Sequence, residues 1–109
     1  MPKGSNLGEF EQHVLAALLR LRDNAYGVTI RCEIAERTGR DVAIGAVYAT
    51  LDRLERKGFV SSRAGEPTPE RGGRAKRYFR IEAPGMRALD VSWRMSDRMR
   101  EGLVVPVGA

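Results

Sequence analysis

Residues that commonly build catalytic and metal sites are scarce in this sequence. Its 109 residues include one cysteine, Cys32, and one histidine, His13. A single cysteine excludes an intramolecular disulfide, and one cysteine with one histidine provides too few ligands for a zinc site. We therefore expect no metal and no cofactor. The simplest interpretation is a Cys32 thiol packed within a helix and a surface imidazole at His13.

Long apolar runs are missing as well. The opening residues MPKGSNLGEF contain no apolar stretch of signal-peptide length, and no segment approaches the roughly 20 apolar residues of a membrane span. The sequence also lacks a serine–histidine–aspartate set, a metal cluster and a glycine-rich phosphate loop between a strand and a helix. These absences predict a cytoplasmic protein that has no membrane partner, no catalytic residues and no enzymatic activity.

Positive charge is what the sequence has in excess. Nineteen Lys and Arg residues against fourteen Asp and Glu residues give a net charge of +5 and a pI near 10.0. The chain is long enough for one domain with one core and too short for two. A basic domain predicts an acidic partner. Double-stranded DNA fits best, because no helix combines a lysine-rich face with an aromatic-rich one as membrane-surface helices do.

Three helices are expected in the first half of the chain. Over residues 7–22, a stripe of apolar residues recurs at three- and four-residue steps: Leu7, Phe10, Val14, Leu18 and Leu21. A second helix is expected over residues 28–38. A third follows a short connector, with Val47, Leu51 and Leu54 on its buried side. Helix, tight link and helix is the helix-turn-helix arrangement.

The outward face of the third helix is small near its start and basic further along. A projection at 100° per residue places on it Ala46, Ala49, Thr50, Arg53 and Lys57. Small residues allow close approach to a major groove, where Arg53 can reach a base edge or a phosphate. An ordinary solvated face is the alternative, and the helix alone does not decide between the two. Tyr48 falls on a third flank with Asp52 and Glu55.

A basic ribbon is expected after this helix. Residues 59–63 and 75–81 are strand-like, and the loop between them is rich in glycine and proline. From residue 71 to residue 80 there is no acid, and the basic residues are Arg71, Arg74, Lys76, Arg77 and Arg80. Like charges this close repel one another unless something neutralises them, and phosphates do so. A solvated hairpin normally mixes both signs, so this segment favours DNA binding.

The last helix is expected over residues 83–104, with Pro84 in its first turn. Its charged side carries Arg87, Asp90, Arg94, Asp97, Arg98 and Glu101. The rest, more than half of the circumference, carries Met86, Ala88, Leu89, Val91, Ser92, Trp93, Met95, Met99 and Leu103. A helix that covered only its own domain would need a narrower apolar arc. We therefore expect a second copy of the chain to cover the excess in a two-fold dimer.

The single tryptophan lies on this arc. If two such helices pair, two Trp93 rings could flank a cavity for a flat aromatic ligand, with Met86 and Leu89 beside them. The alternative is that Trp93 and the methionines only pack the core of the dimer. The second interpretation is favoured, and the first makes Met86, Leu89 and Trp93 candidate effector residues.

These stretches together resemble the PadR family of transcriptional regulators. The resemblance covers nearly the whole chain and rests on the segments LGEFEQHVLAALL, AYGVTIRCEIAERTGR, IGAVYATLDRLERKGFV, RGGRAKRYFRI and APGMRAL, in that order. It implies a mainly α-helical winged helix-turn-helix with a two-stranded wing and a long C-terminal dimerisation helix, and usually repression of a nearby promoter. Several family members are released from DNA by small aromatic or other toxic compounds.

The resemblance also bears on single residues. It implies that the first helix assists dimerisation. Together with the apolar arc of the last helix, this gives the expected dimer residues Phe10, Leu89, Trp93, Met95, Met99 and Leu103. The Tyr48 hydroxyl would touch the DNA backbone, although packing of its ring under the wing is almost as well supported. Ala43 and Ala46 stand where family members often have Ser and Thr. Because alanine cannot cap a helix, we expect Asp41 to cap the third one.

The resulting prediction is a homodimeric, ligand-responsive repressor acting on a pseudo-palindromic promoter site. The expected DNA contacts are Ala46, Tyr48, Thr50, Arg53, Lys57, Arg71, Arg74, Lys76 and Arg77. The chain is expected to divide into a flexible terminus at 1–6, a DNA-binding domain at 7–82, a dimerisation helix at 83–104 and a tail at 105–109. The alternative is a winged-helix module that binds an acidic protein and no specific DNA sequence.

Overall fold

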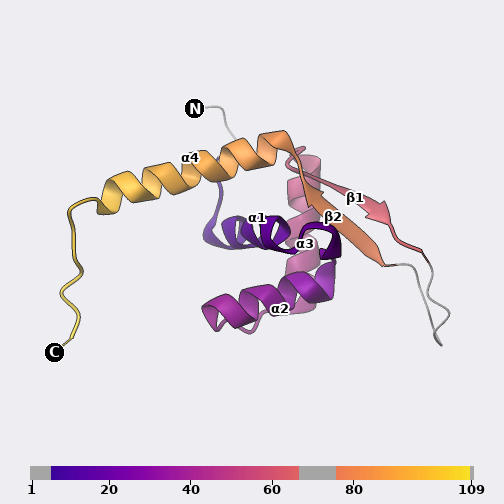
Figure 1. Cartoon of the computed structure of the whole chain (residues 1–109), viewed down its shortest axis with the longest axis horizontal. Coiled ribbons are helices and arrows are strands. Elements are labelled where there is room, and N and C mark those ends of the chain that lie inside the picture. Colours follow the sequence, from indigo (N-terminus) through magenta and orange to yellow (C-terminus); the bar gives the residue numbers. More distant parts are fainter. Residues whose placement is uncertain (1–5, 67–75, 109) are drawn as a thin grey trace.

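A computed structural model of the chain describes residues 6–66 and 76–108, and over these ranges it contains four α-helices, one short 3-10 helix and one two-stranded sheet. The helices are α1 (Glu9–Leu21), α2 (Gly27–Thr38), α3 (Ile44–Arg56) and α4 (Ala83–Arg100), and the 3-10 turn η1 spans Arg22–Asn24. The strands are β1 (Val60–Ala64) and β2 (Arg77–Ile81). Figure 1 shows α1 and α2 below α4, α3 running crosswise behind them, and the sheet at one end.

Helix α1 forms the centre of the core. It begins at Glu9, and the Gly8 N–H donates to the Glu11 carboxylate at 3.0 Å, which satisfies one free donor of the first turn. Its buried residues are Val14, Leu15, Ala17 and Leu18. Leu15 is fully buried although it lies outside the predicted stripe. The reason is that α1 contacts α2, α3, α4 and the sheet, so its buried arc is wider than that of a surface helix.

Helices α2 and α3 form the expected helix-turn-helix. Helix α2 begins at Gly27, where the Tyr26 N–H donates to Thr29 Oγ1 at 3.0 Å, and ends at Gly39, which adopts the left-handed conformation with φ 75°. Helix α3 buries Val47, Leu51 and Leu54 completely, as predicted. Because the hydrophobic stripe of α3 packs on α1, the opposite face of α3 is directed outward.

The wing is a regular antiparallel pair. Val60 lies opposite Ile81 and Ala64 opposite Arg77, so each strand lies within a residue or two of its predicted limits. Phe79 and Ile81 point into the core. The Phe79 N–H also donates to the Ala25 carbonyl at 2.8 Å, and Tyr26 forms an isolated bridge with Tyr78. The segment that enters α2 is therefore attached to β2 by one backbone hydrogen bond and one isolated β-bridge.

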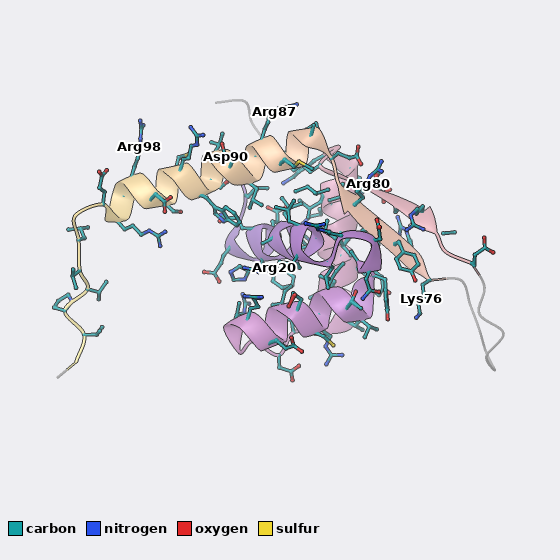
Figure 2. All side chains as sticks on the ribbon, viewed as in Figure 1. Arg20, Lys76, Arg80, Arg87, Asp90 and Arg98 are labelled. Atoms are coloured by element: carbon teal, nitrogen blue, oxygen red, sulfur yellow. The ribbon has the colours of Figure 1, made fainter. Side chains whose placement is uncertain are left out.

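Helix α4 leaves the domain after its first turns. Gly85, Ala88 and Leu89 are buried, whereas every residue from Trp93 to Arg100 is exposed. Gly85 is needed because a β-carbon there would overlap the carbonyl oxygen of Phe59. In Figure 1 the far half of α4 extends well beyond α1 and α2. The charged side was placed correctly, since Arg87, Asp90 and Arg98 project away from the domain (Figure 2).

Two expectations about scarce residues were wrong. Cys32 is exposed on α2, because its neighbour Ile34, rather than Cys32 itself, faces α1. His13 is half-buried and lines a groove between α1 and α2, where its Nδ1 atom is enclosed without a hydrogen-bond partner. None of the helices in the described ranges is both long and apolar enough to span a bilayer.

Candidate nucleic-acid interface

The outward face of α3 is smaller than predicted. Ala46, Ala49 and Arg53 are exposed, but Thr50 is only 2% exposed, so its placement on this face was wrong. Thr50 follows Val47 by three residues and precedes Leu54 by four, which puts it at the edge of the buried stripe, where the packing of α3 on α1 and α2 buries it. Its hydroxyl accepts a hydrogen bond from Arg53 Nη2 at 3.1 Å. Thr50 thus holds the side chain of Arg53 against the helix while that side chain remains accessible.

Lys57 follows the last turn of α3. Its Nζ lies 3.1 Å from Glu11 Oε2 of α1 and 5.9 Å from the centre of the Phe59 ring. The Glu11 side chain is only 12% exposed, so water screens this ion pair less than a fully exposed one. In this structure Lys57 links α3 to α1, and its DNA contact stays a prediction.

Tyr48 packs against the start of α2. A β-carbon at Gly27 would overlap the hydroxyl end of the Tyr48 ring, so the ring occupies the position that a side chain at residue 27 would take. The side chain is 40% exposed. The sequence allowed a DNA contact by the Tyr48 hydroxyl or packing of its ring under the wing. The ring does pack, but it packs against α2 rather than under the wing. A contact between its hydroxyl and DNA stays a prediction.

Two of the arginines of the wing form ion pairs that the sequence did not indicate. Arg77 reaches two acids of α3, with 2.5 Å to Glu55 Oε1 and 3.5 Å to Asp52 Oδ1. Arg80 lies 3.1 Å from Glu82. The expectation that these two charges need phosphates for neutralisation was therefore wrong. Two acids distant in sequence neutralise Arg77, and the nearby Glu82 neutralises Arg80. Arg71 and Arg74 lie outside the described residues.

Lys76 lies directly before β2, at the end of the strand that is farther from α4 (Figure 2). Its Nζ lies 4.5 Å from the centre of the Tyr26 ring and 3.5 Å from the Tyr26 hydroxyl. The Tyr26 ring in turn meets Tyr78 edge to face at 5.5 Å. An aromatic platform orients an ammonium without neutralising it, so Lys76 remains able to meet a phosphate. The Tyr–Gly pair at 26–27 was noted only as a motif, and the sequence did not show that Tyr26 would support Lys76.

The first turn of α3 has no side-chain cap. Ala43 occupies the N-cap position, and Asp41 pairs instead with Arg31 of α2 at 3.4 Å. The expectation that Asp41 caps α3 was wrong, because Asp41 lies two residues before the cap and faces α2. The N-terminus of α3 is therefore small and carries free backbone N–H groups.

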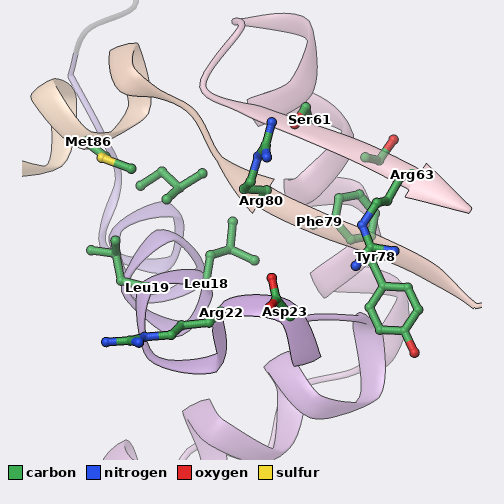
Figure 3. Close-up of a pocket in the computed structure, with 12 residues that line it drawn as sticks. Leu18, Leu19, Arg22, Asp23, Ser61, Arg63, Tyr78, Phe79, Arg80 and Met86 are labelled. Atoms are coloured by element: carbon green, nitrogen blue, oxygen red, sulfur yellow. The ribbon is translucent and has the colours of Figure 1, made fainter. Parts of the chain in front are cut away.

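A hollow of about 550 Å³ lies between α1, η1, the sheet and the start of α4. It is lined by Leu18, Leu19, Arg22, Asp23, Ser61, Ser62, Arg63, Tyr78, Phe79, Arg80, Ile81 and Met86 (Figure 3). Hydrogen bonds donated by the Ser61 hydroxyl (2.7 Å) and by Arg80 (3.1 Å) hold the pKa of the neighbouring Glu82 carboxyl below its ordinary value. No local sequence signal marks this hollow, because α1, η1, both strands and α4 all contribute to it.

The predicted effector residues do not converge within one chain. Met86 lines the hollow just described, Leu89 is buried in the core, and Trp93 lies beside Gln12 at the start of α1. Of the predicted dimer residues, Phe10 is half-buried beneath the Arg40 guanidinium, and four on or after α4 are exposed: Trp93, Met95, Met99 and Leu103. A shared pocket would need a second copy of the chain.

Comparisons with known proteins agree with this architecture. The model of the transcriptional regulator PadR-like family matches residues 14–91. No curated protein matches the sequence. A PadR family transcription regulator from hypervirulent Clostridium difficile is similar in structure, with a TM-score of 0.69, 23% identity, and coverage of 86% of this chain and 96% of that one. A transcriptional regulator from Clostridium thermocellum has a TM-score of 0.68 and 23% identity, with coverage of 87% of this chain and 89% of that one. A PadR-like transcription factor from Bacteroides fragilis has a TM-score of 0.68 and 20% identity, with coverage of 87% of this chain and 89% of that one.

A helix-turn-helix followed by a two-stranded wing defines the winged-helix class of DNA-binding regulators. Both the mainly α fold and the winged helix are thereby confirmed. Because the matched residues make up more than half of the chain, this protein belongs to the PadR-like family of transcriptional regulators.

Proposed function

We propose that the protein is a homodimeric repressor that binds a pseudo-palindromic promoter site and is released by a small aromatic ligand. The observation that carries this proposal is the arrangement of α3, which presents Ala46, Ala49 and Arg53 to solvent beside a wing that carries Lys76. Small side chains allow a helix to enter a major groove, and arginine reads guanine edges.

The two basic elements would have different roles. Arg53 is held by Thr50 on a rigid helix, which suits a contact to a base edge. Lys76 lies at the end of a strand on the Tyr26 ring, which suits a contact to the phosphate backbone. A protein that occupies a promoter with both elements would repress transcription by excluding the polymerase.

The dimer is proposed from α4. Trp93, Met95 and Met99 are 45%, 51% and 79% exposed on a helix that has already left its own core. Large apolar side chains grouped on one projecting helix mark an interface. Pairing through α4 would relate two α3 helices by a two-fold axis, and half-sites spaced by whole helical turns follow from that symmetry.

The DNA-binding proposal is tested by charge-matched substitutions. The site is first obtained by selecting bound fragments from the source genome. Anisotropy titrations then compare Arg53→Ala, Lys76→Ala and the control Arg87→Ala, which removes the same charge from the outward side of α4. We expect Arg53→Ala to reduce the preference for the selected site by about 10- to 100-fold and Lys76→Ala to weaken all duplexes alike. The Arg87→Ala control should change neither quantity.

Two outcomes would contradict this proposal. If the unaltered protein bound selected and scrambled duplexes equally, the alternative of an interaction module for acidic proteins would replace it. If Arg53→Ala and Lys76→Ala both behaved like Arg87→Ala, the assignment of the interface would be wrong. The effector is tested separately by titrating planar aromatic compounds against Trp93 fluorescence, where a complete lack of quenching across a broad panel would remove the ligand from the proposal.

A further inference from the structure

The chain that follows α4 is strongly apolar and fully exposed. Leu103, Val104, Val105 and Val107 are 72%, 89%, 72% and 81% exposed, and together with Pro106 they form the apolar tail, residues 103–107. Helix α4 ends at Arg100, Gly102 lies in the following turn with φ 78°, and the tail continues without helix or strand. An exposed apolar segment of this length costs free energy unless another surface covers it.

The hollow beside the sheet is suited to such a segment. Its floor is apolar, and two floor residues, Leu19 and Met86, are 42% and 46% exposed. Its rim carries the donors of Arg22 and Arg80 and the carboxylate of Asp23 (Figure 3). An extended peptide needs both donors and acceptors for its backbone as well as an apolar surface for its side chains. The Asp23 carboxylate makes the hollow less suitable for a simple organic anion.

The tail of the same chain cannot reach this hollow. Helix α4 starts beside the hollow at Met86 and carries the tail away from it, since 18 residues of helix span about 27 Å. Figure 1 shows the tail and the sheet at opposite ends of a molecule whose longest extent is 54 Å. Any tail that fills the hollow therefore belongs to another copy of the chain.

A two-fold dimer would bring the two features together. The exposed apolar residues of α4 and of the chain directly after it run from Met86 to Leu103. In an isologous contact the axis passes through the middle of the shared patch. If that axis passes beside the middle of α4 and perpendicular to it, the two helices are antiparallel, and Leu103 of one copy lies level with Met86 of the other. The tail then continues toward the floor formed by Leu19 and Ile81.

We propose that the apolar tail of each copy docks in the hollow between α1, the wing and α4 of the other copy. This inference rests on the proposed dimer and adds a reciprocal exchange to it. Each tail would bury its valines on Leu18, Leu19, Ile81 and Met86, while the rim residues pair with its backbone. The wing strands form one wall of the hollow, so the tail of one copy would contact the DNA-binding domain of the other.

Cysteine trapping tests the exchange directly. In a Cys32→Ser background, chains with Leu19→Cys are mixed with tagged chains carrying Val105→Cys and are equilibrated with oxidised glutathione. We expect a mixed disulfide between the two chains. In the matched control, Ala46→Cys, also an exposed position but on the outward face of α3, replaces Leu19→Cys and should give no mixed disulfide above background.

A truncation after residue 102 gives an independent measurement. Sedimentation should show the dissociation constant of the dimer raised by about tenfold or more, with an unchanged circular dichroism spectrum. A dimer that forms with equal affinity in both lengths and gives no Leu19–Val105 disulfide would overturn the exchange and leave the proposed dimer standing. A full-length chain that stays monomeric at high concentration would overturn the dimer and the exchange together.

Discussion

Replacement of Gly85 by alanine tests how closely α4 approaches the rest of the domain. Gly85 is buried in the first turn of α4, and a β-carbon there would overlap the backbone oxygen of Phe59 and crowd Ile81 Cγ1 at 3.0 Å. A backbone oxygen cannot move aside in the way that the end of a flexible side chain can. The start of α4 would have to shift away from the sheet.

The expected size follows from two opposing effects. Alanine is favoured over glycine within a helix by up to about 1 kcal/mol. Forcing one extra carbon into a tightly packed site costs about 1–3 kcal/mol, and more where backbone must move. We therefore expect Gly85→Ala to lower the free energy of unfolding by about 1–2 kcal/mol net. A domain of this size would lose several degrees in Tm.

Gly45 provides the matched control. It lies in the first turn of α3, and a β-carbon there would meet nothing within 4 Å. Gly45→Ala should keep the helix-propensity gain without the overlap and raise stability by as much as about 1 kcal/mol. Urea unfolding at one fixed protein concentration measures both variants. Equal stabilisation by the two substitutions would show that Gly85 is not in close contact with Phe59.

Three further substitutions have defined outcomes. Ala43→Ser should cap α3 and raise the free energy of unfolding by about 1 kcal/mol in a urea titration, and no gain would contradict an uncapped helix start. Because the pKa of Glu82 is lowered in the folded state, its ionised form stabilises the fold above the ordinary carboxyl range, and this contribution disappears as pH falls through the folded pKa. The difference in Tm between the parent and Glu82→Gln should therefore shrink between pH 6 and pH 3, and a constant difference would refute it. Trp93→Ala should raise the dissociation constant of the proposed dimer by about 30-fold in sedimentation, whereas no change would exclude Trp93 from the interface.

Helix positions and the order of elements could be predicted from sequence because they depend on local periodicity. Val47, Leu51 and Leu54 recur at helical steps, and Gly39 marks the end of α2. The mistakes at Thr50 and Cys32 concern the edges of helical faces. At such an edge, a rotation of the helix by about 100°, the angle between consecutive residues, exchanges a buried side chain for an exposed one. Such edges are decided by neighbouring elements, which a single helix projection does not contain.

The electrostatics of the wing could not be predicted from a sequence window. The segment from residue 71 to residue 80 contains no acid, yet Arg77 pairs with Glu55, which precedes it by 22 residues, and with Asp52. Fold topology brings those carboxylates beside β2. The hollow beside the sheet was missed for the same reason, since Leu19, Ser61 and Met86 meet only in three dimensions.

The hydrogen bond from the Phe79 N–H to the Ala25 carbonyl adds a backbone attachment between the wing and the helices. The buried side chains of Phe79 and Ile81 already anchor β2 in the core. Here β2 is also bound to the two residues that precede α2, through this bond and the Tyr26–Tyr78 bridge. A force on the wing is thus delivered to the first turn of α2, where Gly27 accommodates the ring of Tyr48.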